Sequence, residues 1–255
     1  MYPEPILAIL DDQFNLYQLI IIVGIAALLP LAWRVGRERN IQRRIVFFGW
    51  AIAIASALIG GYSLPHFVHS YDDNLPYSWS LGAILTALLS TGAYVLWLGR
   101  RIPNRREALD ILAPCMAFAF VLGRLACFAA GCCNGKPAVG LPWAVTFTNP
   151  ASASNYENIP VHPTQLYESA GSLLILIVLL ALFNHPKMKG VLIWVFFAMY
   201  GGLRFANEFF RGDVRTMIGV LSLNQWVCLA TVVIGSIVLI IHLEAVSRRR
   251  VAVAG

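Results

Sequence analysis

Charged residues are scarce in this sequence. Only 13% of its 255 residues are Asp, Glu, Lys or Arg, whereas 58% are hydrophobic. A soluble globular domain carries about twice that share of charge, so this class is excluded. Intrinsic disorder is excluded as well, because disordered chains are poor in hydrophobic residues. The composition instead predicts a polytopic membrane protein built from apolar helices.

Seven apolar stretches are each about long enough to cross the hydrocarbon core of a bilayer as a helix. They are Leu16–Trp33, Ile45–Leu64, Leu81–Leu98, Leu109–Ala130, Leu166–Phe183, Gly190–Phe205 and Leu221–Leu243. The sequence contains no internal repeat and no linker rich in Gly, Ser or Pro. We therefore expect one all-α integral membrane domain over residues 1–255, with about seven transmembrane helices and an outer loop at about 131–164.

The positions of the basic residues predict an orientation. Fourteen of the nineteen Lys and Arg residues follow the first, third, fifth or seventh stretch. Cytoplasmic loops are enriched in these residues, so we expect the N-terminus outside and the C-terminus in the cytoplasm. The net charge of +6 follows the loops instead of forming one patch. Nucleic acid is therefore not an expected partner.

Several ionisable residues lie inside the apolar stretches. Arg124 is in the outer part of the fourth stretch, Glu168 opens the fifth, and Arg204 and Glu208 lie toward the outer end of the sixth. A charge within a membrane span costs about 2.5–3.5 kcal/mol on insertion scales. The predicted topology places all of these groups near the outer leaflet, which indicates a functional site at that depth.

Helical spacing relates four polar residues of the sixth stretch. Tyr200, Arg204, Glu208 and Arg211 are four, four and three positions apart, so we expect them on one helix face. A structural Arg204–Glu208 ion pair, or a snorkelling arginine at the helix end, is the alternative to a functional role. Arginines at one depth favour an anion site, because a guanidinium binds two phosphate oxygens at once. An outer-leaflet anion within an apolar body suggests a phospholipid head group.

Three segments, in this order, resemble the bacterial prolipoprotein diacylglyceryl transferase family. They are Gly123–Pro137 (GRLACFAAGCCNGKP), His162–Glu168 (HPTQLYE) and Arg204–Asp213 (RFANEFFRGD). The family transfers the diacylglyceryl group of phosphatidylglycerol to the lipobox cysteine of a preprolipoprotein and releases glycerol phosphate. The resemblance implies a multi-pass enzyme of the bacterial cytoplasmic (inner) membrane, surrounded by membrane lipid, with seven spans and an outer N-terminus. We expect no cofactor.

The resemblance also implies roles for individual residues. It assigns Arg124 to the phospholipid, and Arg204, Glu208 and Arg211 to a second charged cluster. We expect Arg124 and Arg204 to bind the phosphate, and Glu208 to hold Arg204 or to move a proton. His162 is a candidate base, or else an ordinary loop histidine ahead of a helix. The other candidates for substrate binding are Gln165, Tyr167, Tyr200, Cys132 and Asn134.

The sequence departs from the family pattern in two places. The family usually has a histidine in a His-Gly-Gly-Leu stretch, but the corresponding region here, Tyr77–Gly82, contains none; His66 and His69 are expected on the preceding loop. Cys127 and Cys132 stand where the family typically has Asn and Glu. These departures leave open a phospholipid-binding homologue without transferase activity.

The five cysteines are odd in number, so not all of them can pair within one chain. We expect Cys115 and Cys228 to pack in the core as small apolar residues. Cys127, Cys132 and Cys133 lie near the predicted outer face, where a membrane thiol oxidoreductase is a further alternative. Their spacing matches no standard zinc motif, so we expect no metal. Our preferred interpretation is that they have a local structural role or line the site.

Overall fold

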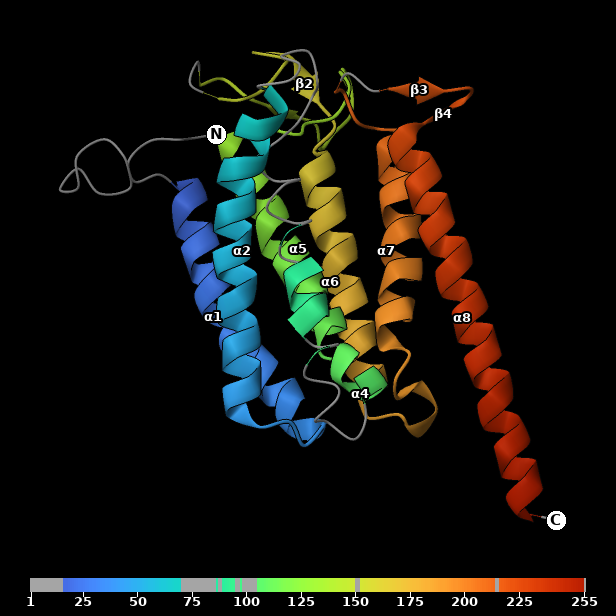
Figure 1. The fold of residues 1–255 in the computed structure, drawn as a ribbon. Coiled ribbons are helices and arrows are strands. Elements are labelled where there is room, and N and C mark those ends of the chain that lie inside the picture. The colour runs from blue at the N-terminus through green and yellow to red at the C-terminus, as the bar shows by residue number, and fades with distance from the viewer. Residues whose placement is uncertain are drawn as a thin grey trace. The chain divides into compact units, whose positions relative to one another are not determined.

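The computed structural model describes residues 16–69, 86, 89–94, 97, 105–149, 152–213 and 216–254. This part of the chain is mostly helical (Figure 1). It forms two compact units. One combines the chain up to Leu28 with Ala113–Gly255, and the other is Leu29–Leu112.

The larger unit contains most of the secondary structure. Its helices are the start of α1 (Leu16–Glu38), α5 (Leu112–Ala130), α6 (Thr164–Phe183), α7 (Leu192–Glu208), α8 (Leu223–Ala254) and the 3-10 turn η1 (Pro186–Met188). Its strands are β1 (Val145–Thr146), β2 (Pro160–Val161), β3 (Met217–Ile218) and β4 (Leu221–Ser222). The smaller unit holds the rest of α1, α2 (Arg43–His69) and α4 (Arg105–Leu109).

Within the described part of the chain, four helical segments are long and apolar enough to cross a membrane. They are Leu16–Glu38, Arg106–Ala130, Thr164–Phe183 and Leu223–Arg249. Large apolar side chains are exposed on α6 and α8, as expected where lipid replaces water. Six of the seven predicted stretches coincide with helices, and the third, Leu81–Leu98, lies largely outside the described residues.

Helix α2 corrects one expectation. It continues to His69, so His66 and His69 belong to this helix and not to a loop after it. The helix continues through Gly60, Gly61 and Pro65, residues that normally weaken or end a helix, so the sequence did not indicate that it would reach His69.

Helices α7 and α8 pack closely because of a small residue. A Cβ atom at Gly201 of α7 would collide with the Thr231 hydroxyl and would lie 3.0 Å from the carbonyl oxygen of Cys228 on α8. In lipid, helices associate through such close contacts and not through the hydrophobic effect. This packing places the end of α7 beside the start of α8.

The loop between α5 and α6 is ordered by short pairings. Strand β1 pairs antiparallel with β2, with Val145 opposite Val161. Phe147, which follows β1, is fully buried. Figure 1 places β2, β3 and β4 at the end of the larger unit where α6 and α8 begin. The predicted outer loop is therefore a folded cap over this end of the helices.

Candidate functional site

The three segments that resemble the family meet at Gly135. Its amide donates to the carbonyl of His162 at 2.9 Å, and the amide of the next residue donates to the carbonyl of Phe210 at 2.8 Å. A Cβ atom at Gly135 would lie 2.6 Å and 2.7 Å from these two carbonyl oxygens. Only glycine permits this approach, so the local backbone holds the three segments together.

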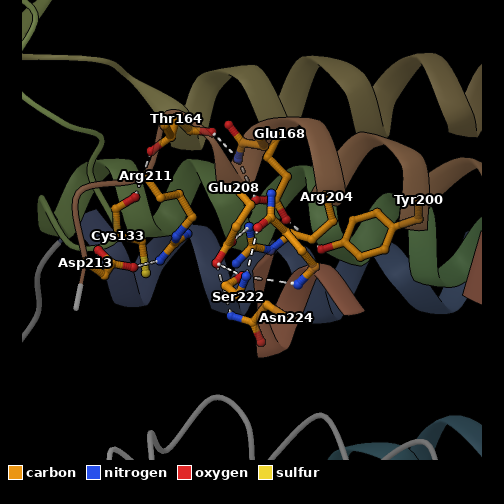
Figure 2. A network of polar contacts seen from close by, with 12 residues as sticks. Cys133, Thr164, Glu168, Tyr200, Arg204, Glu208, Arg211, Asp213, Ser222 and Asn224 are labelled. Carbon is orange, nitrogen blue, oxygen red and sulfur yellow. Dashed lines mark hydrogen bonds and ion pairs between the residues drawn. The ribbon is translucent and has the colours of Figure 1, made fainter. Parts of the chain in front are cut away.

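Glu168 is the centre of a buried polar network (Figure 2). Its carboxylate pairs with the Arg124 guanidinium at 2.9 Å. It also accepts hydrogen bonds from the Tyr200 hydroxyl at 2.6 Å and from the Asn207 amide at 3.0 Å. Helices α5, α6 and α7 thus each contribute to one cluster. These contacts satisfy a carboxylate that would be costly to bury alone.

A second pair lies one turn from the end of α7. Arg204 forms a salt bridge with Glu208, four residues later, as the spacing predicted. The Glu208 carboxylate also accepts hydrogen bonds from the Ser222 hydroxyl at 3.1 Å and from the Asn224 amide at 3.5 Å. Strand β4 and the first turn of α8 therefore also bind this carboxylate.

Arg211 lies outside the helix on which the spacing placed it. Helix α7 ends at Glu208, and Arg211 pairs by a β-bridge with Gly135. Its guanidinium pairs with Asp213, and Figure 2 shows it pointing toward Cys133. Burial opposes the charge of Arg211, but the carboxylate of Asp213 and the Cys133 sulfur together raise the pKa of the guanidinium overall.

The arginines are more exposed than the glutamates that hold them. The side chains of Glu168 and Glu208 are 0% and 1% exposed, whereas those of Arg124 and Arg204 are 17% and 14% exposed. A guanidinium has five N–H donors and a single ion pair does not use them all. Each glutamate therefore fixes its arginine from the buried side, and part of each arginine side chain stays accessible.

The turn after α5 brings three thiols together. The sulfur atoms of Cys127, Cys132 and Cys133 all lie within 4.8 Å of one another. The Cys132 carbonyl accepts from the Gln165 amide at 2.7 Å, and the Cys133 carbonyl accepts from the Thr164 hydroxyl at 2.9 Å. The start of α6 therefore fixes the backbone on which the thiols stand.

The Cys132 thiol donates to the Cys127 carbonyl at 3.6 Å. The two neighbouring thiols, followed by the charges of Arg211 and Arg124, lower the pKa of Cys133 although burial acts in the opposite direction. A cysteine thiolate is a much better nucleophile and metal ligand than a thiol. The prediction of no metal rested on sequence spacing, which does not reveal that the turn folds these three sulfurs onto one another.

Three buried amide oxygens near these groups have no hydrogen-bond partner among the described residues. They belong to Asn134, Gln165 and Asn207. Asn134 and Asn207 each use the amide nitrogen, in hydrogen bonds to the Ser154 hydroxyl and to Glu168. Buried acceptors are rarely left without a donor, so these oxygens are suited to bind hydroxyl groups of a ligand.

His162 belongs to a neighbouring aromatic group. Its Nδ1 lies 3.3 Å from the Tyr167 hydroxyl, which also accepts from the Trp143 indole at 2.8 Å. The rings of His162 and Phe210 are 5.2 Å apart. The side chains of His162 and Tyr167 thus contact each other and neighbouring aromatic rings, at the start of α6.

The structure adds Asn207 and Ser222 to the site, which the sequence did not single out. Glu168 was already recognisable as a charge in an apolar stretch, but its position between Arg124 and Tyr200 depends on tertiary packing. Asn207 is uncharged and its partner Glu168 lies on another helix, so spacing within the sequence does not indicate its role. Ser222 lies in a different segment, and no pattern in the sequence indicates its contact with Glu208.

Comparison with known proteins gives a consistent result. The sequence matches the family described as prolipoprotein diacylglyceryl transferase over residues 5–241. It is 32% identical over 225 residues to the phosphatidylglycerol–prolipoprotein diacylglyceryl transferase of Clostridium tetani (strain Massachusetts / E88), covering 86% of this chain and 89% of that one. Proteins of the same name in Finegoldia magna and Dehalococcoides mccartyi (strain CBDB1) are 28% and 30% identical. These two matches cover 87% and 80% of this chain, and 88% and 80% of the respective relatives. The chain belongs to the prolipoprotein diacylglyceryl transferase family.

Proposed function

We propose that this chain transfers the diacylglyceryl group of phosphatidylglycerol to the lipobox cysteine of a preprolipoprotein, with release of glycerol phosphate. Its relatives are named for transfer from phosphatidylglycerol to a prolipoprotein. Family membership over most of the chain supports the same activity here.

One observation carries the assignment to this site. Arg124 and Arg204 are each fixed by a buried glutamate and retain an accessible side, at the end of the larger unit where the three signature segments meet. This arrangement suits a phosphodiester, because two preorganised guanidiniums can each donate to its oxygens. We assign Arg211, which pairs with Asp213 next to the cysteines, to the same head group.

The chemistry follows from these positions. A thiolate attacks the glycerol carbon next to the phosphate, and the C–O bond breaks with its electron pair going to the phosphate. Arg124 and Arg204 stabilise the charge that develops on this leaving oxygen, as preorganised cations do in other sites. Glu208 positions Arg204. His162 stands near Tyr167 and is the proposed acceptor for the thiol proton.

The neutral part of the head group also has partners. The unpartnered oxygens of Asn134 and Gln165 are suited to accept from the glycerol hydroxyls of phosphatidylglycerol. Tyr167 and Tyr200 add hydroxyl groups nearby, and Cys132 lines the same turn. These residues would distinguish phosphatidylglycerol from a phospholipid whose head group lacks hydroxyls.

The membrane arrangement belongs to the same proposal. We assign the chain to the bacterial cytoplasmic (inner) membrane as one integral domain with seven spans. Its N-terminus would be outside and its C-terminus cytoplasmic, so the arginines would face the outer leaflet. The lipobox peptide of a preprolipoprotein would then reach the site from the outer side, and nucleic acid has no role.

A transfer assay with purified components tests the function. Full-length protein in detergent would receive phosphatidylglycerol and a lipobox peptide, and glycerol phosphate and peptide mass would be measured. We expect Arg124→Ala to lower kcat/KM by roughly 100-fold, the cost of losing one preorganised donor to a developing anion.

Arg248→Ala is the matched control. Arg248 is an exposed arginine near the end of α8, so its loss would leave the rate unchanged. Transfer by Arg124→Ala at the wild-type rate would contradict the assignment of Arg124. Wild-type protein that binds phosphatidylglycerol but forms no lipidated peptide would instead indicate a lipid-binding homologue.

A further inference from the structure

The three clustered thiols have the dimensions of a metal site. A zinc–sulfur bond is about 2.3 Å long, so three sulfurs on one tetrahedral ion lie about 3.8 Å apart. Cys127, Cys132 and Cys133 have their sulfurs within 4.8 Å of one another and form no disulfide. Side-chain rotations that move each sulfur by less than about 1 Å, a displacement on the order of ordinary thermal motion, would bring the sulfurs to the separation that zinc requires.

The backbone holds the cluster in this arrangement. Cys133 has a φ of +61°, in the left-handed region that non-glycine residues seldom adopt. The start of α6 binds the carbonyls of Cys132 and Cys133 through Gln165 and Thr164. Strained backbone that its surroundings enforce is common at functional sites. Here the conformation turns Cys133 toward the two other thiols.

The charges around the cluster are compatible with a thiolate-bound ion. Three thiolates and one Zn²⁺ carry a net charge of −1. Arg211 and Arg124 are both within electrostatic reach of Cys133, and they would compensate this charge. Thiolates are soft ligands that select Zn²⁺ and Cu⁺ over Mg²⁺ or Ca²⁺. Zn²⁺ takes four ligands, so three cysteines leave one position open.

We propose that Cys127, Cys132 and Cys133 bind Zn²⁺ and that the open fourth position takes the acceptor cysteine thiol of the lipobox peptide. The second half of this proposal rests on the proposed function. A thiol bound to a metal ion is deprotonated, which is what the transfer requires. The ion would thus compensate for the missing histidine at Tyr77–Gly82.

The step balances in atoms and charge. The acceptor S–H bond loses its proton to water or His162 as the sulfur binds Zn²⁺. The S–C bond to the glycerol carbon then forms as the C–O bond to phosphate breaks, and the phosphate leaves with the electron pair beside Arg124. No oxidant or reductant is needed, because replacing the C–O bond by a C–S bond changes the oxidation state of neither the carbon nor the sulfur.

Cobalt binding tests the site without reference to activity. Full-length protein in detergent would be reduced, treated with a chelator and titrated with Co²⁺. We expect one Co²⁺ per chain with a thiolate-to-cobalt charge-transfer absorption that Zn²⁺ removes. Cys127→Ser, Cys132→Ser and Cys133→Ser should each weaken binding at least tenfold, whereas Cys115→Ser, a matched thiol outside the cluster on α5, should not.

Two results would overturn the site. One is the absence of this absorption in reduced wild-type protein, a measurement that does not depend on any variant folding. The other is an absorption that survives unchanged in all three serine variants.

The peptide tests the open position. A lipobox peptide with its cysteine should strengthen the absorption by adding a fourth thiolate, and the same peptide with serine should not. Equal transfer rates with and without Zn²⁺ would overturn the activating role while the transferase remained. Bound cobalt and peptide thiol without release of glycerol phosphate would overturn the proposed function and leave the metal site.

Discussion

A single carboxylate, Glu168, connects the polar residues of three helices. It accepts from Arg124, Tyr200 and Asn207, and its side chain is fully buried. A buried carboxylate in this position does not contact solvent, so it acts on a substrate only through the groups it holds. Glu168 is therefore a positioning residue for Arg124.

Glu168→Gln tests this role. The amide keeps the size of the side chain but removes the charge that holds Arg124, and the breaking of a buried ion pair is strongly unfavourable. We expect kcat/KM for lipid transfer to fall at least tenfold, with a rise in KM for phosphatidylglycerol. Glu168→Asp should restore part of the activity, because it returns the charge.

Tyr200→Phe is the milder companion variant. It removes only one hydrogen bond to Glu168, worth about 0.5–1.5 kcal/mol, so its effect should stay within about tenfold. An activity of Glu168→Gln equal to wild type, in protein of unchanged melting temperature, would show that Arg124 does not need this partner.

The same residues show how far sequence reasoning reaches at this scale. The Arg204–Glu208 pair was predictable, because i and i+4 residues meet on any helix. The Arg124–Glu168 pair joins two helices, and no local rule relates residues so far apart in sequence. A charge inside an apolar stretch nevertheless needs a partner. Arg124 in the fourth stretch and Glu168 in the fifth were therefore each expected to have one.

At the scale of elements, another buried ion pair links two turns of the smaller unit, the one after α1 and the one before α5. Arg39 follows α1, Asp110 stands between α4 and α5, and the two pair at 3.3 Å with side chains 1% and 0% exposed. A turn at Asp110 and Ile111 separates the short helix α4 from α5 near the start of the fourth apolar stretch. Pro114 accounts for this turn, since its ring clashes with the carbonyl four residues earlier, that of Asp110.

Asp110→Ala should destabilise the protein strongly. It leaves Arg39 buried without this carboxylate, and breaking a buried pair costs about 3–5 kcal/mol. We expect a clear fall in the melting temperature measured in detergent. The double variant Arg39→Met with Asp110→Leu should recover much of the loss, because apolar residues often replace a buried pair at little cost. If Asp110→Ala has the same melting temperature as the wild type, the pair contributes nothing to stability.

Element ends were less predictable than element positions. The apolar runs predicted the positions of six helices correctly, because a helix surrounded by lipid needs a long apolar sequence. Helix α7, however, ends at Glu208, and Arg211 belongs to a bridge with Gly135. The end is set by contacts of the loops that follow, and hydrophobic periodicity does not record those contacts.

At the scale of the whole molecule, the orientation decides whether the site can meet its substrates. The basic residues predict a cytoplasmic C-terminus, and the arginine cluster then lies toward the outer leaflet. A lipobox cysteine that has crossed the membrane would reach the cluster only in this orientation. The opposite orientation would place the same arginines at the inner leaflet.

Reporter fusions test this orientation directly. A fluorescent protein fused to the C-terminus should fluoresce, and alkaline phosphatase at the same position should be inactive, because phosphatase needs the oxidising outer compartment. Phosphatase inserted after Gly140, in an exposed turn of the cap over α5 and α6, should be active. Transfer activity of the C-terminal fusion serves as the control for folding. Active phosphatase at the C-terminus would reverse the orientation, and the site would then have to receive its peptide from the cytoplasm.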